Sequence, residues 1–187
     1  MLRKDKLILE NLISKYGKNK INESLRGNDV VIKNMLELFA QSSSGVQSAL
    51  FKQKAKDATS VEITSIYDIF SPEEIKQIKK YVKPQMKQCY KNAYHMADFF
   101  EDLGVEYVEG YLNMNGLPIE HAFNVIDGKY FDITMELVTN KKYPTNRTND
   151  TYVSIGTFSV NEVRKILVQN EFYGQIYETT FLNNYSE

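Results

Sequence analysis

With 187 residues, of which 42% are hydrophobic, the chain is long enough for one globular domain, or for one domain with a helical extension. A net charge of −1 supplies no basic field for nucleic acid or an anionic membrane surface, and no apolar run approaches the roughly 20 residues of a membrane span. The single cysteine, Cys89, permits no internal disulfide, and the charged N-terminus lacks the apolar core of a secretory signal, so we expect a protein of the reducing cytoplasm.

The first 60 residues are predicted to be helical. Apolar residues recur at helical spacing over 3–16, and Asp29 is placed to cap a second helix that the polar stretch 42–45 ends. A third, short and lysine-rich helix is expected over 46–57. We therefore assign 1–60 to an N-terminal helical extension, which either packs on the main domain or forms an arm for a partner protein.

One strand and one helix are predicted before the cysteine. Polar and apolar residues alternate over 61–67, which predicts a strand. Residues 71–74 read Ser-Pro-Glu-Glu, a sequence typical of a capped helix start. This helix is expected to end near Val82, because a proline follows two residues later.

Cys89 begins the next predicted helix, which Gly104 ends. An apolar stripe at helical spacing begins with the cysteine and consists of Cys89, Ala93, Met96, Phe100 and Leu103. The stripe places Cys89 on the buried face of the helix, at its N-terminal end.

Three antiparallel strands are predicted to follow, over 105–114, 117–126 and 129–137. Asn-Gly separates the first two and Asp-Gly the last two, and these dipeptides are the strongest signals for two-residue hairpin turns. After a polar loop, a strand is expected over 152–158, then a helix of residues 160–169 that Ser159 caps, and the tail over 173–185 is a candidate for one more strand.

The turns set a register that brings a histidine and an aspartate together. If the loop between Ile126 and Lys129 has two residues, His121 faces Thr134, and Asp132 lies on the same sheet face as His121, about 7 Å away at the backbone. A three-residue loop would instead place Asp132 on the opposite face.

The side of the strand that carries His121 is otherwise apolar, so His121 is expected to point towards the core. We expect the apolar stripe of the Cys89 helix to cover this same face. Gly110 is predicted to lie opposite His121, where the missing side chain leaves room for an imidazole or a substrate. Pro118 disfavours regular pairing near the first turn.

Cys, His and Asp in this order are the parts of a thiol-nucleophile site. A helix N-terminus and an imidazolium lower the pKa of a thiol, so Cys89 would attack while His121 carries the proton and Asp132 orients the imidazole. The backbone N–H of Cys89, with the side chain of Gln85 or Gln88, would bind the oxyanion.

No metal or cofactor is expected. The other histidine, His95, lies about 240° around the helix from Cys89 and is predicted to face away from the site. The histidines and the cysteine match no zinc-binding spacing, and the sequence contains no phosphate loop and no dinucleotide-binding glycine motif.

These segments resemble the transglutaminase-like branch of the papain-like cysteine-enzyme superfamily. The resemblance covers residues 88–136, where it rests on Gln88-Cys89-Tyr90-Lys91-Asn92-Ala93, Tyr107-Val108-Glu109-Gly110-Tyr111, His121-Ala122-Phe123-Asn124-Val125 and Asp127-Gly128-Lys129-Tyr130-Phe131-Asp132-Ile133-Thr134. Phe123 and Ile133 stand where the family often has Trp and Pro. The resemblance implies Cys89 as nucleophile, His121 as base and Asp132 as orienting residue.

A small member of this superfamily, of the kind found in phage and bacterial genomes, would fold as an α+β domain over 61–187, with the nucleophile helix packed on an antiparallel sheet. Its function would be acyl transfer from an amide of a protein or peptide through a thioester, which water or an amine then resolves. Glu109 and Glu120 would either favour a basic substrate or belong to solvated strand faces. The alternatives are a non-catalytic binding protein on the same fold, such as a phage-encoded protein that engages a host protein through the N-terminal helices, and a tyrosine-rich structural subunit.

Overall fold

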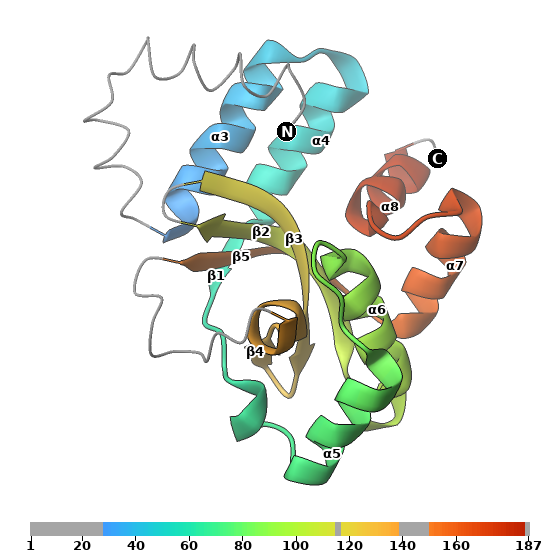
Figure 1. Cartoon of the computed structure of the whole chain (residues 1–187). Coiled ribbons are helices and arrows are strands. Elements are labelled where there is room, and N and C mark those ends of the chain that lie inside the picture. Colours follow the sequence, from blue (N-terminus) through green and yellow to red (C-terminus); the bar gives the residue numbers. More distant parts are fainter. Residues whose placement is uncertain (1–27, 115–116, 139–149, 186–187) are drawn as a thin grey trace.

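The computed structural model describes residues 28–114, 117–138 and 150–185, and the helix predicted over 3–16 lies outside them (Figure 1). Helices surround an antiparallel, curled sheet, which confirms the α+β class. In the described part of the chain, no helix is both long and apolar enough to cross a membrane.

The sheet has five strands among the described residues, in the order β1-β5-β2-β3-β4, and each neighbouring pair is antiparallel. Their bounds are β1 Thr59–Val61, β2 Glu106–Met114, β3 Leu117–Ile126, β4 Lys129–Phe131 and β5 Thr151–Phe158. The strands predicted over 105–114, 117–126 and 152–158 are confirmed to within one residue. The pairing of Ile126 with Lys129 also confirms the two-residue turn between them.

The segment after β1 joins the two edges of the curled sheet. Ile63 forms a parallel bridge with Tyr130 of β4, and the N–H of Thr64 donates to the Tyr130 carbonyl at 2.7 Å. β1 ends at Val61, Ile63 bridges to β4, and residues 66–68 form a 3-10 turn, so the single strand predicted over 61–67 is wrong. Within the curl lies a small apolar cluster of Val108, Leu112, Phe123, Val125, Met135 and Tyr152.

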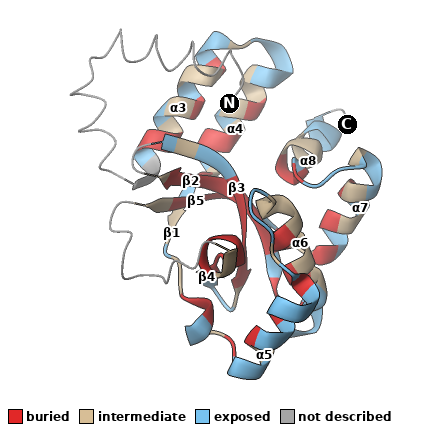
Figure 2. Ribbon diagram, viewed as in Figure 1, coloured by how far each residue is buried: buried red, intermediate tan, exposed pale blue. Residues whose placement is uncertain are grey.

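Helices cover the outer face of the sheet, and Figure 2 shows that the helix faces turned towards the strands carry the buried residues. Their bounds are α3 Asn28–Ser42, α4 Gly45–Asp57, α5 Pro72–Gln77, α6 Cys89–Phe99, α7 Val160–Asn170 and α8 Ile176–Tyr185. The capping boxes predicted at Ser71 and Ser159 are present at the starts of α5 and α7. The helix that begins with α5 continues as the π-helical turn η2, Ile78–Val82, and so ends where it was predicted to end.

The predicted helices α3 and α4 belong to the main apolar core. Ile32 and Leu36 of α3 and Leu50 of α4 are buried in the same cluster as Ala93 and Met96 of α6. The helix α3 begins at Asn28, so Asp29 lies within it and is not its cap. The division at residue 60, and a role of the extension in binding a partner, stay predictions.

The tail is helical, so the strand suggested over 173–185 is wrong. The first two N–H groups of α8, those of Ile176 and Tyr177, donate to the carboxylate of Glu109 at 3.0 and 2.9 Å. Glu109 also accepts the Tyr107 hydroxyl at 2.8 Å and is only 5% exposed. A buried carboxylate on β2 thus satisfies the start of a helix that is far away in sequence.

The third predicted strand is much shorter than 129–137. The side chain of Asp132 accepts the N–H groups of Thr134 and Met135 at 2.9 and 3.0 Å, which turns the chain into the π-helical segment η4, Thr134–Val138. β4 therefore ends at Phe131, and its pairing with β3 ends at Asn124.

Candidate functional site

Cys89, His121 and Asp132 come together in one line. Nε2 of His121 lies 2.6 Å from Oδ2 of Asp132, and the thiol of Cys89 lies close enough to the His121 side chain for each group to shift the pKa of the other. Because Nε2 is taken by the carboxylate, Nδ1 is the ring nitrogen left for the sulfur. His121 and Asp132 are 4% and 1% exposed, while Cys89 is half-buried. The nucleophile candidate therefore lies at the outer end of a buried pair.

The register agrees with its prediction, but the histidine and aspartate meet in a different way. Gly110 pairs with His121, and Ile126 with Lys129, as expected. His121 does not face Thr134 across a ladder, because β4 has already ended and Thr134 lies in η4. Asp132 instead sits at the turn after β4, from which its side chain reaches His121.

The Cys89 helix packs on the other face of β3 from His121, so the prediction that its stripe covers the His121 face is wrong. Ala93 of α6 clusters with Ala122, and the Asn124 side chain donates to the Ala93 carbonyl at 2.8 Å. Successive side chains of a strand point to opposite faces, so His121 is directed into the curl of the sheet. The sequence pattern could not reveal this, because both faces of β3 are covered.

Cys89 reaches His121 around the edge of the sheet. The thiol of Cys89 lies close enough to the backbone N–H of Ala122 for that N–H to lower the thiol pKa, at a position where β4 no longer pairs with β3. The early end of β4 thus opens the edge of β3, and the first residue of α6 occupies it. Because β4 is short, Cys89, which comes from the outer face, can contact the imidazole of His121, which lies on the inner face.

Asp132 is held from several sides. Besides its two backbone donors, it accepts the hydroxyl of Tyr152 on Oδ2 at 2.9 Å. Tyr152 lies edge-on to the ring of His121, with centroids 6.0 Å apart, and Phe123 stacks near the same ring at 6.4 Å. These contacts fix the orientation of both the carboxylate and the imidazole.

The charges of the line stabilise one another. Burial by itself would raise the pKa of Cys89, but the hydrogen bond and charge of His121 outweigh it and hold the pKa below the ordinary value of 9.0. Burial would lower the pKa of His121, yet the charge and hydrogen bond of Asp132, helped by Cys89, raise it to about 10. Burial opposes ionisation of Asp132 too, and the charge of His121 still holds its pKa below the ordinary value. Between the pKa of Cys89 and that of His121, the site is a thiolate, an imidazolium and a carboxylate.

Asn92 positions the nucleophile, and the sequence analysis missed it. Its side chain accepts the N–H of Gln85 at 3.0 Å and donates to the Gln85 carbonyl at 2.7 Å and the Thr134 hydroxyl at 3.0 Å. It therefore ties the segment before Cys89 to the helix and to the turn after Asp132. The signal was available, since Asn92 stands three residues after Cys89 and so on the same helix face.

Replacing Asn92 by alanine should lower the free energy of unfolding by about 2–3 kcal/mol, because three hydrogen bonds are lost, one of them to the buried Thr134 hydroxyl. It should also slow alkylation of Cys89, whose preceding segment is no longer anchored. Urea unfolding and alkylation with iodoacetamide measure the two effects. Asn170→Ala, which removes the partly buried hydrogen bonds to Thr179, is the matched control. Equal stability of the two variants would contradict the anchoring role.

The predicted oxyanion and substrate residues are placed as follows. The Gln85 side chain is exposed and its backbone is held by Asn92, while Gln88 is half-buried and directly precedes α6 without a side-chain cap. A Cβ at Gly110 would lie 1.9 Å from the carbonyl oxygen of Val153, so close approach of β5, and not room for the imidazole, requires this glycine. Which group binds an oxyanion stays a prediction.

The two glutamates differ in environment. Glu109 is buried at the start of α8, so its placement on a solvated strand face is wrong. The side chain of Glu120 is 61% exposed and lies 3.5 Å from the buried Lys54. Within 28–114, 117–138 and 150–185, no group of three or more potential ligands is arranged to hold a metal ion.

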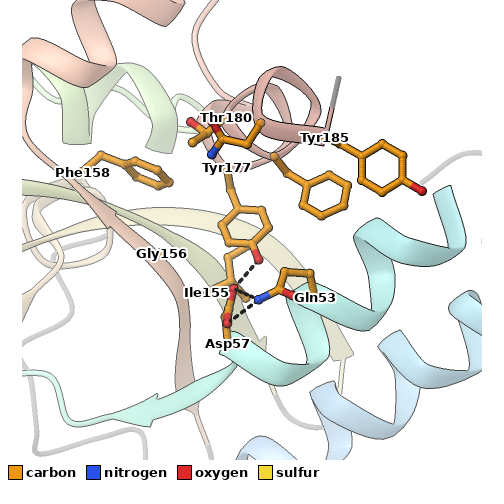
Figure 3. A pocket seen from close by; sticks show the side chains of 10 residues that line it. Gln53, Asp57, Ile155, Gly156, Phe158, Tyr177, Thr180 and Tyr185 are labelled. Atoms are coloured by element: carbon orange, nitrogen blue, oxygen red, sulfur yellow. Dashed lines mark hydrogen bonds between the residues drawn. The ribbon is translucent and has the colours of Figure 1, made fainter. Parts of the chain in front are cut away.

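A hollow of about 490 Å³ lies elsewhere, between α4, β5 and α8 (Figure 3). At its base Asp57 accepts the side-chain N–H groups of Gln53 and the hydroxyl of Tyr177. Aromatic side chains of Phe158, Phe181 and Tyr185 contribute to its walls. None of its lining residues belongs to the Cys89 line, and its hydrogen bonds connect α4 to α8.

Fold and site together define an α+β protein with a Cys–His–Asp line at the open edge of a curled sheet. No family model matches the chain, and neither the curated proteins nor the solved structures give a match. The function is therefore argued from the geometry and charge of the site.

Proposed function

We propose that the chain is a cysteine-dependent enzyme that transfers an acyl group from an amide, and that it belongs to the transglutaminase-like branch of the papain-like superfamily. The observation that carries the proposal is the line from Cys89 through His121 to Asp132, in which the thiol at the outer end has a lowered pKa. A purely structural cysteine has no need of an imidazolium partner or of access to solvent. The nucleophile helix that packs on an antiparallel sheet also suits this branch.

In the first half of the reaction, the thiolate of Cys89 attacks the amide carbonyl and forms a tetrahedral oxyanion. In this proposal the backbone N–H of Cys89, the first residue of α6, donates to the oxyanion, with Gln85 or Gln88 as the side-chain donor. The carbon–nitrogen bond then breaks, and the amine leaves with the proton that His121 donates. The product is a thioester on Cys89 and a neutral imidazole.

In the second half, the neutral His121 removes a proton from water or from an acceptor amine as it attacks the thioester. Water gives an acid, as in a peptidase, amidase or deamidase, and an amine gives a new amide, as in a transglutaminase. The thiolate leaves and the imidazolium is restored. Asp132 stays ionised throughout and keeps Nε2 of His121 in place, because its remaining oxygen is held by Thr134 and Met135.

The proposal is tested with a library of natural peptides, because one experiment then covers all the acceptors. The library is incubated with wild-type protein or with Cys89→Ala, with and without a small primary amine, and is read by mass spectrometry. We expect cleaved, deamidated or amine-linked peptides in the wild-type sample alone. A library that the wild-type protein leaves unchanged would contradict the proposal and favour the non-catalytic binding protein.

A further inference from the structure

The strand β3 has an open edge beside the nucleophile. β4 pairs only with the last three residues of β3, Asn124 to Ile126, and Figure 1 shows it alongside that end alone. No described strand pairs with residues 117–123 on this side. Leu117 and Ile119 are 46% and 37% exposed, so described residues leave this part of β3 largely uncovered.

The register tells which backbone groups the open edge presents. Ile126 and Lys129 flank a two-residue turn, and such a pair exchanges both of its hydrogen bonds. Every second residue of β3 from Ile126 back therefore directs its N–H and C=O to the β4 side. On the open edge these residues are Ala122, Glu120 and Pro118. The position of the Cys89 thiol near the Ala122 N–H agrees with this parity.

Pro118 fits the same parity. Its missing N–H would point to the open edge, so pairing with Asn113 of β2 remains regular, and the prediction of irregular pairing near this proline is wrong. The proline also limits how far a foreign strand can pair along the edge, which protects against aggregation. Glu120 is left as the residue whose N–H and C=O are both available, and no described residue bonds to either group.

We propose that the substrate of the enzyme is an extended peptide segment that adds to this edge as a short strand by pairing with the backbone of Glu120; this rests on the proposed function. The level of Ala122, where Cys89 sits, is two residues along β3, or about 7 Å, from Glu120. When one peptide residue pairs with Glu120, the carbonyl of the next peptide residue towards Ala122 therefore faces the thiol. Main-chain pairing of this kind is a common mode of peptide recognition.

The side chains on the edge agree with a peptide ligand. A residue that pairs with Glu120 places its own side chain on the outer face, and its neighbours place theirs on the inner face beside the exposed Ile119. Ile119 and Leu117 offer apolar surface there, and the exposed carboxylate of Glu120 offers a negative charge on the other face. An acyl donor without a peptide backbone would use neither these surfaces nor the Glu120 backbone.

The test compares two electrophiles that alkylate Cys89, chloroacetamide and acetyl-trialanine chloromethyl ketone. The measured quantity is the rate with the peptide ketone divided by the rate with chloroacetamide, and it is normalised to the same ratio for a free thiol. For the wild-type protein we expect this normalised ratio to be roughly ten, because two hydrogen bonds to the peptide are gained. Glu120→Pro removes the N–H at the open edge and should abolish most of this preference, measured in the variant as the same normalised ratio of the two rates. Glu120→Ala keeps the N–H and should keep the preference.

A second measurement needs no variant. The same peptide probe, N-methylated at one nitrogen at a time, should lose its advantage on the wild-type protein at one position. A preference that survives both Glu120→Pro and every N-methylation would overturn strand addition, as would a wild-type protein with an activated thiol but no peptide preference. If chloroacetamide instead finds a thiol of ordinary reactivity, the proposed function itself fails.

Discussion

His121→Ala is expected to raise the pH at which Cys89 becomes reactive. In the wild-type protein the imidazolium offsets the effect of burial and holds the thiol pKa below 9.0. In the variant, burial and the negative charge of Asp132 remain, and both raise that pKa. We therefore expect a midpoint above 9.0, and a midpoint that rises by one pH unit lowers the thiolate fraction at pH 7 about tenfold. The measurement is the rate of iodoacetamide alkylation of the folded protein against pH.

The wild-type profile has a second feature, since the thiolate–imidazolium pair persists up to the pKa of His121 at about 10. Above that pH the thiolate remains but loses its charged partner, and the alkylation rate should change again. His95→Ala is the control, because the groups that act on His95 are Lys91 and Asp98 and not Cys89. Identical midpoints in wild type, His121→Ala and His95→Ala would make Cys89 an ordinary core thiol and favour the non-catalytic binding protein.

The parts of the site that follow local rules could be predicted from the sequence. Turn dipeptides fixed the register of β2, β3 and β4, and the start of α6 followed from its apolar stripe. That was enough to bring His121 and Asp132 together and to place Cys89 at a helix N-terminus. Each of these features depends on residues close to one another in the chain.

The parts that depend on distant contacts could not be predicted. Polarity does not tell the two faces of β3 apart, because the inner face is covered by η4 and the outer face by α6. The sequence does not distinguish an aspartate whose side chain ends a strand from an aspartate within a strand, so the end of β4 at Asp132 was missed. The tail was taken for a strand because the buried partner of its first N–H groups, Glu109, stands on β2.

These distant contacts decide the chemistry as well as the fold. Had β4 continued to residue 137, its backbone would occupy the Ala122 N–H and close the edge that Cys89 reaches. Asp132 therefore has two tasks, which are to end the strand through one carboxylate oxygen and to hold His121 through the other. Each oxygen can be assessed separately by mutation.

Asp132→Asn is expected to lower acyl transfer by about 10³–10⁴-fold, the size of effect known for the orienting carboxylate of a serine-protease triad. The amide oxygen can still accept the N–H groups of Thr134 and Met135, so β4 should still end at Phe131. The amide nitrogen, however, cannot accept from His121 or from the Tyr152 hydroxyl, and it carries no charge to stabilise an imidazolium. Tyr152→Phe removes a single donor to the carboxylate and should cost far less activity.

The same Asp132→Asn substitution changes how stability depends on pH. The folded pKa of His121, about 10, exceeds its ordinary value of 6.5, so the stabilisation it brings is fully present below pH 6.5 and is lost as the pH rises through 10. Asp132, whose pKa is depressed, contributes above 3.8, and this contribution is lost as the pH falls through its folded pKa.

Urea unfolding between pH 6.5 and 10 measures this dependence, in a Cys89→Ala background that removes the titration of the thiol. The protein that keeps Asp132 should show a steep fall in the free energy of unfolding over this range, because its imidazolium is lost. The protein with Asp132→Asn should show a shallow fall, because its imidazole is neutral through most of the range. Parallel curves for the two proteins would mean that the carboxylate does not hold a charged imidazole, and the mechanism would lose its proton donor.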